Sequence, residues 1–120
     1  MKTILVAEDR DASRELARTI LEHAGYLVLE AANGADAVEV AKAKLPDLVL
    51  LDLQMPIMNG FEVLRELRLD DRLKSTPIVA LTASAMLGDK QKALMDGFSS
   101  YLTKPLSLSA IRQELARLLA

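Results

Sequence analysis

The chain has no cysteine, no long hydrophobic run and no excess of charge of one sign. Without cysteine it can form neither a disulfide framework nor a cysteine metal site, and it has no thiol nucleophile. Its 15 basic and 17 acidic residues give a formal net charge of −2. This balance does not favour direct binding to nucleic acid or to an anionic membrane. Any chemistry must therefore come from carboxylates, hydroxyls and lysine.

The length and hydrophobicity of the chain suit one compact domain. Its 120 residues are 51% hydrophobic, which is enough for one core and leaves little room for a second. The first apolar run, residues 4–7, is far shorter than the apolar part of a signal peptide, and no later run approaches the length of a membrane span. We therefore expect a cytoplasmic protein made of a single domain over residues 1–120, without an output domain.

Short apolar runs alternate with longer segments of helical period, a pattern typical of repeated βα units. Residues 4–7, 48–51 and 78–81 are apolar without alternation, as expected for central strands of a parallel sheet that is covered on both faces. Residues 26–29 and 100–102 are more mixed and are predicted to be outer strands, with Gly25 at the C′ position of the preceding helix.

Five helices are predicted between and after these strands. Helices are expected over residues 35–44 and 61–69, after residue 88, and from about residue 107 to the end of the chain. The first helix is predicted to bury an apolar stripe consisting of Ala12, Leu16, Ile20 and Ala24, widened by Ala17 and Leu21. Right-handed crossovers between the units predict an open, doubly wound α/β sheet, whose site lies at the carboxyl ends of the strands beside the topological switch point.

Polar residues follow the predicted strands at this edge of the sheet. They are Glu8 and Asp9 after the first strand, Asp52 after the third, Thr82 after the fourth and Lys104 after the fifth. Two carboxylates about 4 Å apart repel by roughly 4 kcal/mol at an effective dielectric constant near 20, so three carboxylates together require a cation. Mg²⁺ prefers such hard oxygen ligands and leaves coordination positions for a phosphoryl oxygen. The set therefore suggests Mg²⁺-assisted phosphoryl chemistry.

Four motifs occur at the strand ends in this order: ILVAEDR, LLDLQMPIMNG, IVALTASA and YLTKP. Together they resemble the response-regulator receiver domains of two-component signalling, and the resemblance covers the whole chain. It implies a flavodoxin-like (βα)5 fold with a five-stranded parallel sheet of order 2-1-3-4-5. It also implies that the chain is a phosphoacceptor signalling domain rather than an enzyme, because it catalyses only its own phosphorylation and dephosphorylation.

The resemblance also implies roles for individual residues. Asp52 matches the phosphoacceptor, Asp9 a direct Mg²⁺ ligand and Glu8 an acid that holds the metal through water, while the backbone carbonyl of Gln54 completes the protein ligands. Gln54 and Ser84 occupy positions that tune the lifetime of the phosphorylated state in receivers, and neither is acidic.

A second group of residues matches the switch of these domains. Lys104 would pair with the phosphoryl oxygens, Thr82 would move its hydroxyl toward them, and Tyr101 would turn inward behind Thr82. The bond between Lys104 and Pro105 is expected to be cis. The resemblance implies a histidine kinase or a histidine phosphotransfer protein as phosphoryl donor, and a downstream protein partner at the surface of the fourth helix, fifth strand and fifth helix. It allows a monomer or a weak homodimer.

Other interpretations of these residues remain open from the sequence. An aspartate-nucleophile phosphatase of the haloacid dehalogenase type uses similar chemistry, but it usually places its nucleophile after the first strand in a D-x-D pattern. A flavin-binding module shares the fold, although acids stand where a phosphate cradle would be needed. A pseudo-receiver acting by binding alone is a third possibility. We expect structural roles for His23 and for the methionines Met55, Met58, Met86 and Met95.

Overall fold

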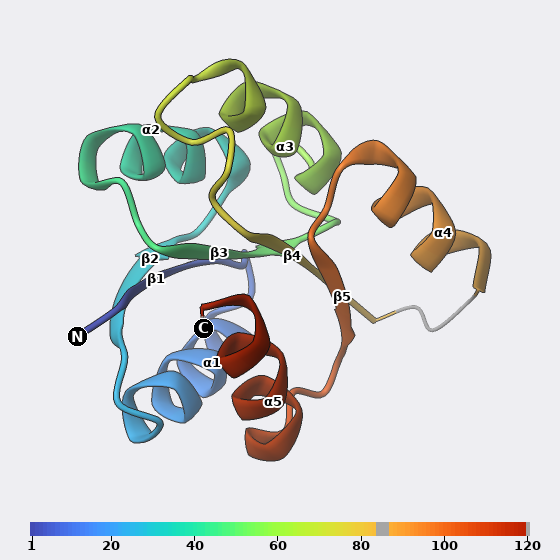
Figure 1. Cartoon of the computed structure of the whole chain (residues 1–120). Coiled ribbons are helices and arrows are strands. Elements are labelled where there is room, and N and C mark those ends of the chain that lie inside the picture. Colours follow the sequence, from blue (N-terminus) through green and yellow to red (C-terminus); the bar gives the residue numbers. More distant parts are fainter. Residues whose placement is uncertain (84–86, 120) are drawn as a thin grey trace.

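The computed structural model describes residues 1–83 and 87–119, over which parallel strands alternate with helices (Figure 1). The strands are β1 (Thr3–Ala7), β2 (Leu27–Ala31), β3 (Leu48–Asp52), β4 (Ile78–Thr82) and β5 (Ser100–Thr103). They form one sheet of order β2-β1-β3-β4-β5, in which every neighbouring pair is parallel. The predicted fold class, strand order and central strands are therefore confirmed.

The helices cover both faces of the sheet. They are α1 (Asp11–His23), α2 (Gly34–Lys44), α3 (Gly60–Leu69), α4 (Leu87–Asp96) and α5 (Leu108–Leu118). Helices α1 and α5 lie on one face, and α2, α3 and α4 lie on the other (Figure 1). None of the helices in the described part of the chain is both long and apolar enough to cross a membrane.

Alternating side chains of the central strands supply two separate cores. On β3, Leu48 and Leu50 pack with α1 and α5, whereas Val49 and Leu51 pack with α2 and α3. All residues of β3 are buried, and burying one such leucine side chain contributes about 1.5–3 kcal/mol relative to leaving it exposed. This burial on both faces explains why the central strands are continuous apolar runs.

Side chains at the helix starts fix where several helices begin. Asn59 accepts a hydrogen bond from the backbone N–H of Glu62 at 3.0 Å, and the Glu62 carboxylate accepts one from the N–H of Asn59 at 3.1 Å. Such a reciprocal capping box satisfies backbone donors that the helix itself leaves free.

At the end of α1, Gly25 has φ of 95°, so the predicted C′ glycine is confirmed.

The predicted inward face of α1 is wrong in part. Ala17 and Leu21 are fully buried, whereas Leu16 is 46% exposed and Ala12 is also exposed. The helix is rotated so that Ala17 and Leu21 face the sheet, where they belong to one buried cluster with side chains of β1 and β3. Strand β2 also differs from its prediction, since it begins at Leu27 and continues to Ala31.

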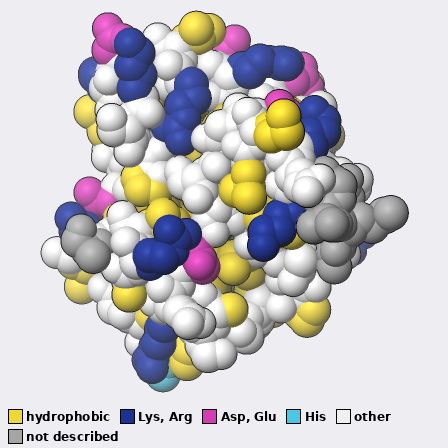
Figure 2. Space-filling view, turned by 45° about the vertical axis from the view of Figure 1, so that its right-hand side comes forward, with side chains coloured by type: hydrophobic (Ala, Val, Ile, Leu, Met, Phe, Trp, Pro, Cys, Tyr) yellow, Lys and Arg dark blue, Asp and Glu magenta, His cyan; other side chains and the backbone are white. Residues whose placement is uncertain are grey.

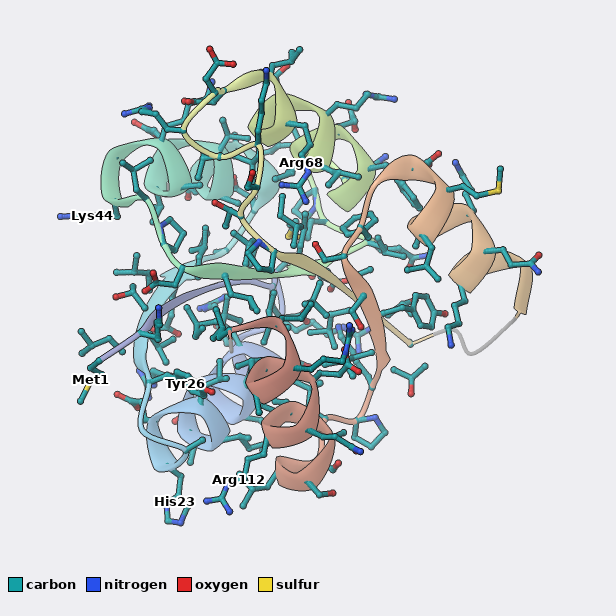
Figure 3. The ribbon with its side chains drawn as sticks, in the orientation of Figure 1. Met1, His23, Tyr26, Lys44, Arg68 and Arg112 are labelled. Atoms are coloured by element: carbon teal, nitrogen blue, oxygen red, sulfur yellow. The ribbon has the colours of Figure 1, made fainter. Side chains whose placement is uncertain are left out.

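The remaining structural expectations have mixed outcomes. Met55 and Met58 pack against the core, as expected, but Met95 is 86% exposed because it lies on the outer side of α4. Met86 and Ser84 lie outside the described residues. His23 points away from the body of the protein at the end of α1 (Figure 3), where a cation suits the helix dipole.

Candidate functional site

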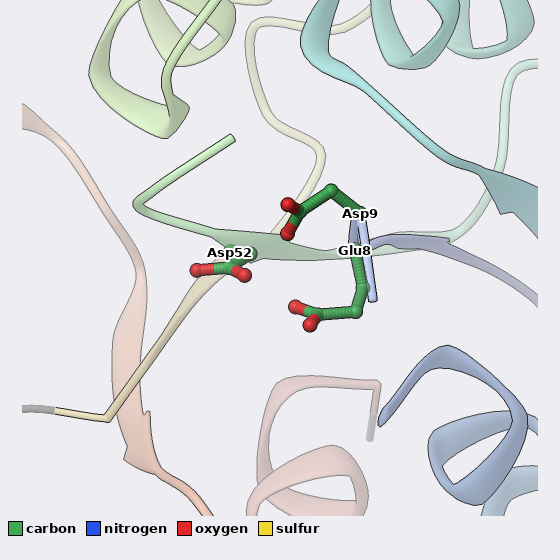
Figure 4. Close-up of side chains that lie close together, drawn as sticks. All are labelled: Glu8, Asp9 and Asp52. Carbon is green, nitrogen blue, oxygen red and sulfur yellow. The ribbon is translucent and has the colours of Figure 1, made fainter. Parts of the chain in front are cut away.

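The strand order brings the carboxyl ends of β1 and β3 side by side at the switch point of the sheet. Glu8 and Asp9 directly follow β1, and Asp52 is the last residue of β3. Their side chains converge (Figure 4), and one carboxylate oxygen from each lies within 4.8 Å of those of the other two. The structure therefore gathers the three acids that the sequence placed at this edge.

Lys104 supplies a positive charge between two of these acids. It follows β5, and its Nζ donates to Glu8 Oε2 at 2.8 Å and to Asp52 Oδ2 at 3.0 Å. Its backbone N–H donates to the carbonyl of Thr82 at 2.7 Å, which ties the loop after β5 to the end of β4. The Lys104–Pro105 peptide bond is cis, as the resemblance implied.

Asp52 is buried but borders a cavity. Its side chain is 7% exposed, and its Oδ1 accepts a hydrogen bond from the backbone N–H of Gln54 at 3.0 Å. This bond and the contact with Lys104 fix both oxygens of the carboxylate. The described residues that line the cavity, whose volume is about 430 Å³, are Asp9, Arg10, Asp52, Gln54, Thr82, Ala83 and Lys104.

Burial makes Glu8 unusually difficult to ionise. Its side chain is 1% exposed, and burial, followed by the hydrogen-bonding interaction with Asp52, raises its pKa to about 7 despite the opposing effect of Lys104. Burial by itself would lower the pKa of Lys104, but its hydrogen bonds to Glu8 and Asp52 outweigh this effect and raise that pKa. The buried acids therefore favour the protonated, positively charged form of Lys104 and would favour any further cation beside them.

The chemistry of the cluster fits a divalent metal ion. The cluster has three carboxylates, and Lys104 pairs with two of them, so its single positive charge leaves negative charge uncompensated. Glu8 Oε1 is buried and has no hydrogen-bond partner in the described part of the chain. An unpaired buried carboxylate oxygen is costly, and a hard cation with its water shell offers it a partner. The residues present therefore fit Mg²⁺.

The two predicted switch residues lie at different places relative to this cavity. Thr82 ends β4, is 6% exposed and lines the cavity. Tyr101 is half-buried on β5 and packs against the core beneath α4, away from the described cavity lining. Arg10 and Ala83 also line the cavity, because they directly follow Asp9 and Thr82, although no motif in the sequence marks them as site residues.

Comparisons with known proteins agree with this fold and show the family of the chain. Residues 4–116 match the family described as the response regulator receiver domain. The chain is 36% identical over 107 residues to the polar-differentiation response regulator DivK of Brucella anthropi, a match that covers 89% of this chain and 87% of the relative.

Solved structures of similar proteins have the same fold. The chemotaxis protein CheY4 of Vibrio cholerae is 31% identical, with a TM-score of 0.92 and coverage of 98% of both chains. The receiver domain of the sensor histidine kinase PA1611 from Pseudomonas aeruginosa is 32% identical, with a TM-score of 0.91 and coverage of 98% of this chain and 97% of that one. In the PA1611 structure, a magnesium ion is coordinated in the active-site cleft.

The parallel sheet of this order, the acidic cluster at its switch point and the family match together indicate a signalling receiver. The chain belongs to the response regulator receiver domain family of two-component signalling. The family consists of phosphoacceptor domains that bind Mg²⁺ at the acidic pocket and interact with histidine kinases or phosphotransfer proteins. Membership in this family argues against the two alternative interpretations of the sequence, a haloacid dehalogenase type phosphatase and a flavin-binding module.

Proposed function

We propose that this chain accepts a phosphoryl group on Asp52 from a phosphohistidine of a histidine kinase or a histidine phosphotransfer protein. The observation that carries the proposal is the placement of Asp52. Its carboxylate ends β3, borders the cavity and is oriented by Lys104 and by the N–H of Gln54. Glu8 also contacts Lys104, but it does not line the cavity, and Asp9 lines the cavity but makes no ion pair with Lys104 among the described residues.

In the transfer step, an oxygen of Asp52 attacks the phosphorus atom of the donor in line with the bond to be broken. The new P–O bond forms as the P–N bond of phosphohistidine breaks, and the electron pair remains on the imidazole nitrogen, which takes a proton from solvent. Lys104 is already 3.0 Å from Asp52 and offsets charge on the transferred phosphoryl group. Fixed orientation and charge are what this reaction needs from a protein.

Asp9, Asp52 and the backbone carbonyl of Gln54 would hold Mg²⁺ directly, and Glu8 would hold it through water. When bound, Mg²⁺ neutralises charge on the phosphoryl oxygens and on the acids around them. Glu8 is suited to an indirect role because its carboxylate lies deepest in the cluster, with the side chain 1% exposed, and already accepts a bond from Lys104.

Phosphorylation would change the contacts of Lys104 and Thr82. A phosphoryl group on Asp52 brings new anionic oxygens into the cavity that both residues border, and these oxygens compete with Glu8 for the ammonium. We propose that Thr82 moves toward the phosphoryl group and that Tyr101 turns inward behind it. Moving an equilibrium from 1:99 to 99:1 requires about 5.5 kcal/mol of differential stabilisation, which several charge-assisted hydrogen bonds can supply.

The surface formed by α4, β5 and α5 would then bind a downstream protein. Two observations support this assignment: Tyr101 lies on β5, and α4 exposes large apolar side chains, with Leu94 43% and Met95 86% exposed. The face shown in Figure 2 carries basic and acidic side chains interspersed with small hydrophobic areas, which suits a protein partner rather than nucleic acid. The same surface would support a weak homodimer.

The phosphorylated state would end by hydrolysis within the same site. Water attacks the phosphorus atom, the bond to the Asp52 oxygen breaks, and the carboxylate and inorganic phosphate are released. The cavity of about 430 Å³ leaves room for that water beside the phosphoryl group. The chain thus catalyses its own phosphorylation and dephosphorylation, and its product is a transient signal.

The test is intact-mass and phosphosite analysis after incubation with acetyl phosphate or a phosphorylated histidine kinase, with Mg²⁺ or with EDTA. We expect one Mg²⁺-dependent, base-labile phosphorylation that is lost in Asp52→Asn. Asp71→Asn is the matched control, because Asp71 is an exposed aspartate outside the site whose side chain is 87% exposed. Absence of phosphorylation with either donor would refute the proposal and leave a pseudo-receiver that acts by binding alone.

A further inference from the structure

The peptide between the two acids after β1 is fixed from both sides. Strand β1 ends at Ala7, so the sheet does not pair the carbonyl of Glu8. The N–H of Glu8 donates to the carbonyl of Ala31 on β2 at 3.0 Å, and the carbonyl of Glu8 accepts a hydrogen bond from Arg14 Nη1 at 2.9 Å. That carbonyl belongs to the peptide unit that leads to Asp9, so Arg14 holds the backbone that carries both acids.

Arg14 is itself held in one position. Its side chain is only 18% exposed. Nη2 donates to Asp11 Oδ1 at 2.6 Å, and Nε lies 3.4 Å from Glu30 Oε1 at the edge of the sheet. Because Arg14 lies in the first turns of α1, its guanidinium joins the helix, β2 and the loop after β1. A planar group with several fixed donors is well suited to orienting a backbone carbonyl.

We propose that Arg14 is a positioning residue for the metal site, which holds the Glu8–Asp9 peptide so that the Asp9 carboxylate stays directed toward Asp52. This inference rests on the proposed Mg²⁺-dependent function. Arg14 is not among the described residues that line the cavity, and its guanidinium contacts the carbonyl of Glu8 rather than the carboxylates of the cluster. Groups that orient metal ligands from behind typically change metal affinity by 10–100-fold when removed.

The direction of the change in Mg²⁺ affinity distinguishes a positioning role of Arg14 from an effect of its charge alone. A cation close to a metal site repels the incoming Mg²⁺, so loss of the Arg14 charge alone would strengthen binding. Loss of the carbonyl contact would release the peptide and weaken binding. Arg18 provides the matched control because it also pairs with Glu30, at 3.4 Å, yet it makes no contact with the carbonyl of Glu8.

The experiment measures the dissociation constant of Mg²⁺ by titration calorimetry for the wild type, Arg14→Ala, Arg14→Lys and Arg18→Ala. We expect binding about tenfold weaker in both Arg14 variants, because lysine keeps the charge but not the fork that reaches the Glu8 carbonyl and Asp11 together. Arg18→Ala should bind as the wild type does or slightly more tightly. Unchanged or tighter binding in a folded Arg14→Ala, or full recovery by Arg14→Lys, would overturn the proposal.

A second measurement needs no metal. In the absence of Mg²⁺, the ¹⁵N order parameters of the Glu8 and Asp9 amides should fall in the Arg14 variants from about 0.85 toward 0.6, while those of Arg18→Ala stay high. If Arg14→Ala does not fold, Arg14→Lys serves for both measurements. If the wild type binds no Mg²⁺, the proposed metal function is refuted. Order parameters that do not change in the Arg14 variants would separately refute the proposal that Arg14 positions the Glu8–Asp9 peptide.

Discussion

Removing one charge from the acidic cluster should stabilise the metal-free protein. Asp9 is the most informative position, because it is exposed and makes no ion pair among the described residues, so Asp9→Asn removes repulsion without breaking a contact with Lys104. The carboxylate oxygens lie within 4.8 Å of one another, and at that upper limit two carboxylates repel by about 3.5 kcal/mol at a dielectric constant of 20 and by about 0.9 kcal/mol in bulk water. Solvent around Asp9 and the nearby ammonium favour the lower end of this range.

We therefore expect Asp9→Asn to raise the free energy of unfolding by about 1 kcal/mol in EDTA at pH 8, where Glu8 is ionised. With a urea dependence of about 2 kcal/mol per molar, the midpoint of unfolding would rise by about 0.5 M. In excess Mg²⁺ the wild type should instead be more stable than Asp9→Asn. A ligand at 100 times its dissociation constant stabilises the native state by about 2.7 kcal/mol, and the wild type should gain most of this while the variant gains little.

The assay is urea unfolding followed by circular dichroism, in EDTA and in excess Mg²⁺. Glu39→Gln is the control, because Glu39 is an exposed acid on α2, outside the acidic cluster, and its loss should change neither condition by more than about 0.5 kcal/mol. A variant less stable than the wild type in EDTA would refute the reasoning about repulsion. An equal gain from Mg²⁺ in both proteins would refute the role of Asp9 as a ligand.

Three further predictions concern other contacts of the structure. The pKa of Glu8 is raised from 4.5 to about 7 on folding, so the native state binds more protons between these values, and the Mg²⁺-free protein should lose stability as pH rises from about 4.5 to about 7. Urea midpoints at pH 5 and pH 8 should show this loss in the wild type and much less of it in Glu8→Gln; an equal loss in both would exclude Glu8 as its source. Arg68 Nη1 donates to three backbone carbonyls in the loop before β4 (Figure 3), at 2.7–3.1 Å, so Arg68→Ala should cost about 2 kcal/mol in chemical unfolding. The exposed Arg65→Ala should change stability by less than about 0.5 kcal/mol, and similar losses in both would argue against the carbonyl contacts. A Cβ at Gly60 would lie 2.6 Å from the backbone oxygen of Asp52, so Gly60→Ala should destabilise the fold by about 1–3 kcal/mol and slow phosphorylation by acetyl phosphate; unchanged stability and rate would contradict that close approach.

The strands and the acids after them could be predicted because local patterns specify them. A strand covered on both faces is an apolar run, as residues 48–51 are, and the charged residue that follows this run, Asp52, is the last residue of β3. Parallel topology then brings all the carboxyl ends to one edge of the sheet. These two rules place Glu8, Asp9 and Asp52 at one edge, and the strand order implied by the family resemblance makes β1 and β3 neighbours, so that the three acids meet.

The buried face of α1 shows where local patterns stop being sufficient. Two adjacent stripes on this helix are apolar, one with Leu16 and Ile20 and the other with Ala17 and Leu21. The i, i+4 spacing predicts that the first stripe is central to the buried face, but in the structure Ala17 and Leu21 of the second stripe are fully buried. Neighbouring stripes of similar hydrophobicity cannot be ranked without the surfaces of β1, β3 and α5 against which the helix packs.

The sequence by itself determined the fold, the order of the elements and the residue types gathered at the site, because hydrophobic period and strand-end chemistry are local properties of the chain. Only the tertiary structure decided how those residues act on one another. It placed Lys104 between Glu8 and Asp52, raised the pKa of Glu8 through burial, and directed Arg14 to the carbonyl of Glu8. Distances, burial and the direction of a long side chain depend on the packing of segments far apart in the sequence.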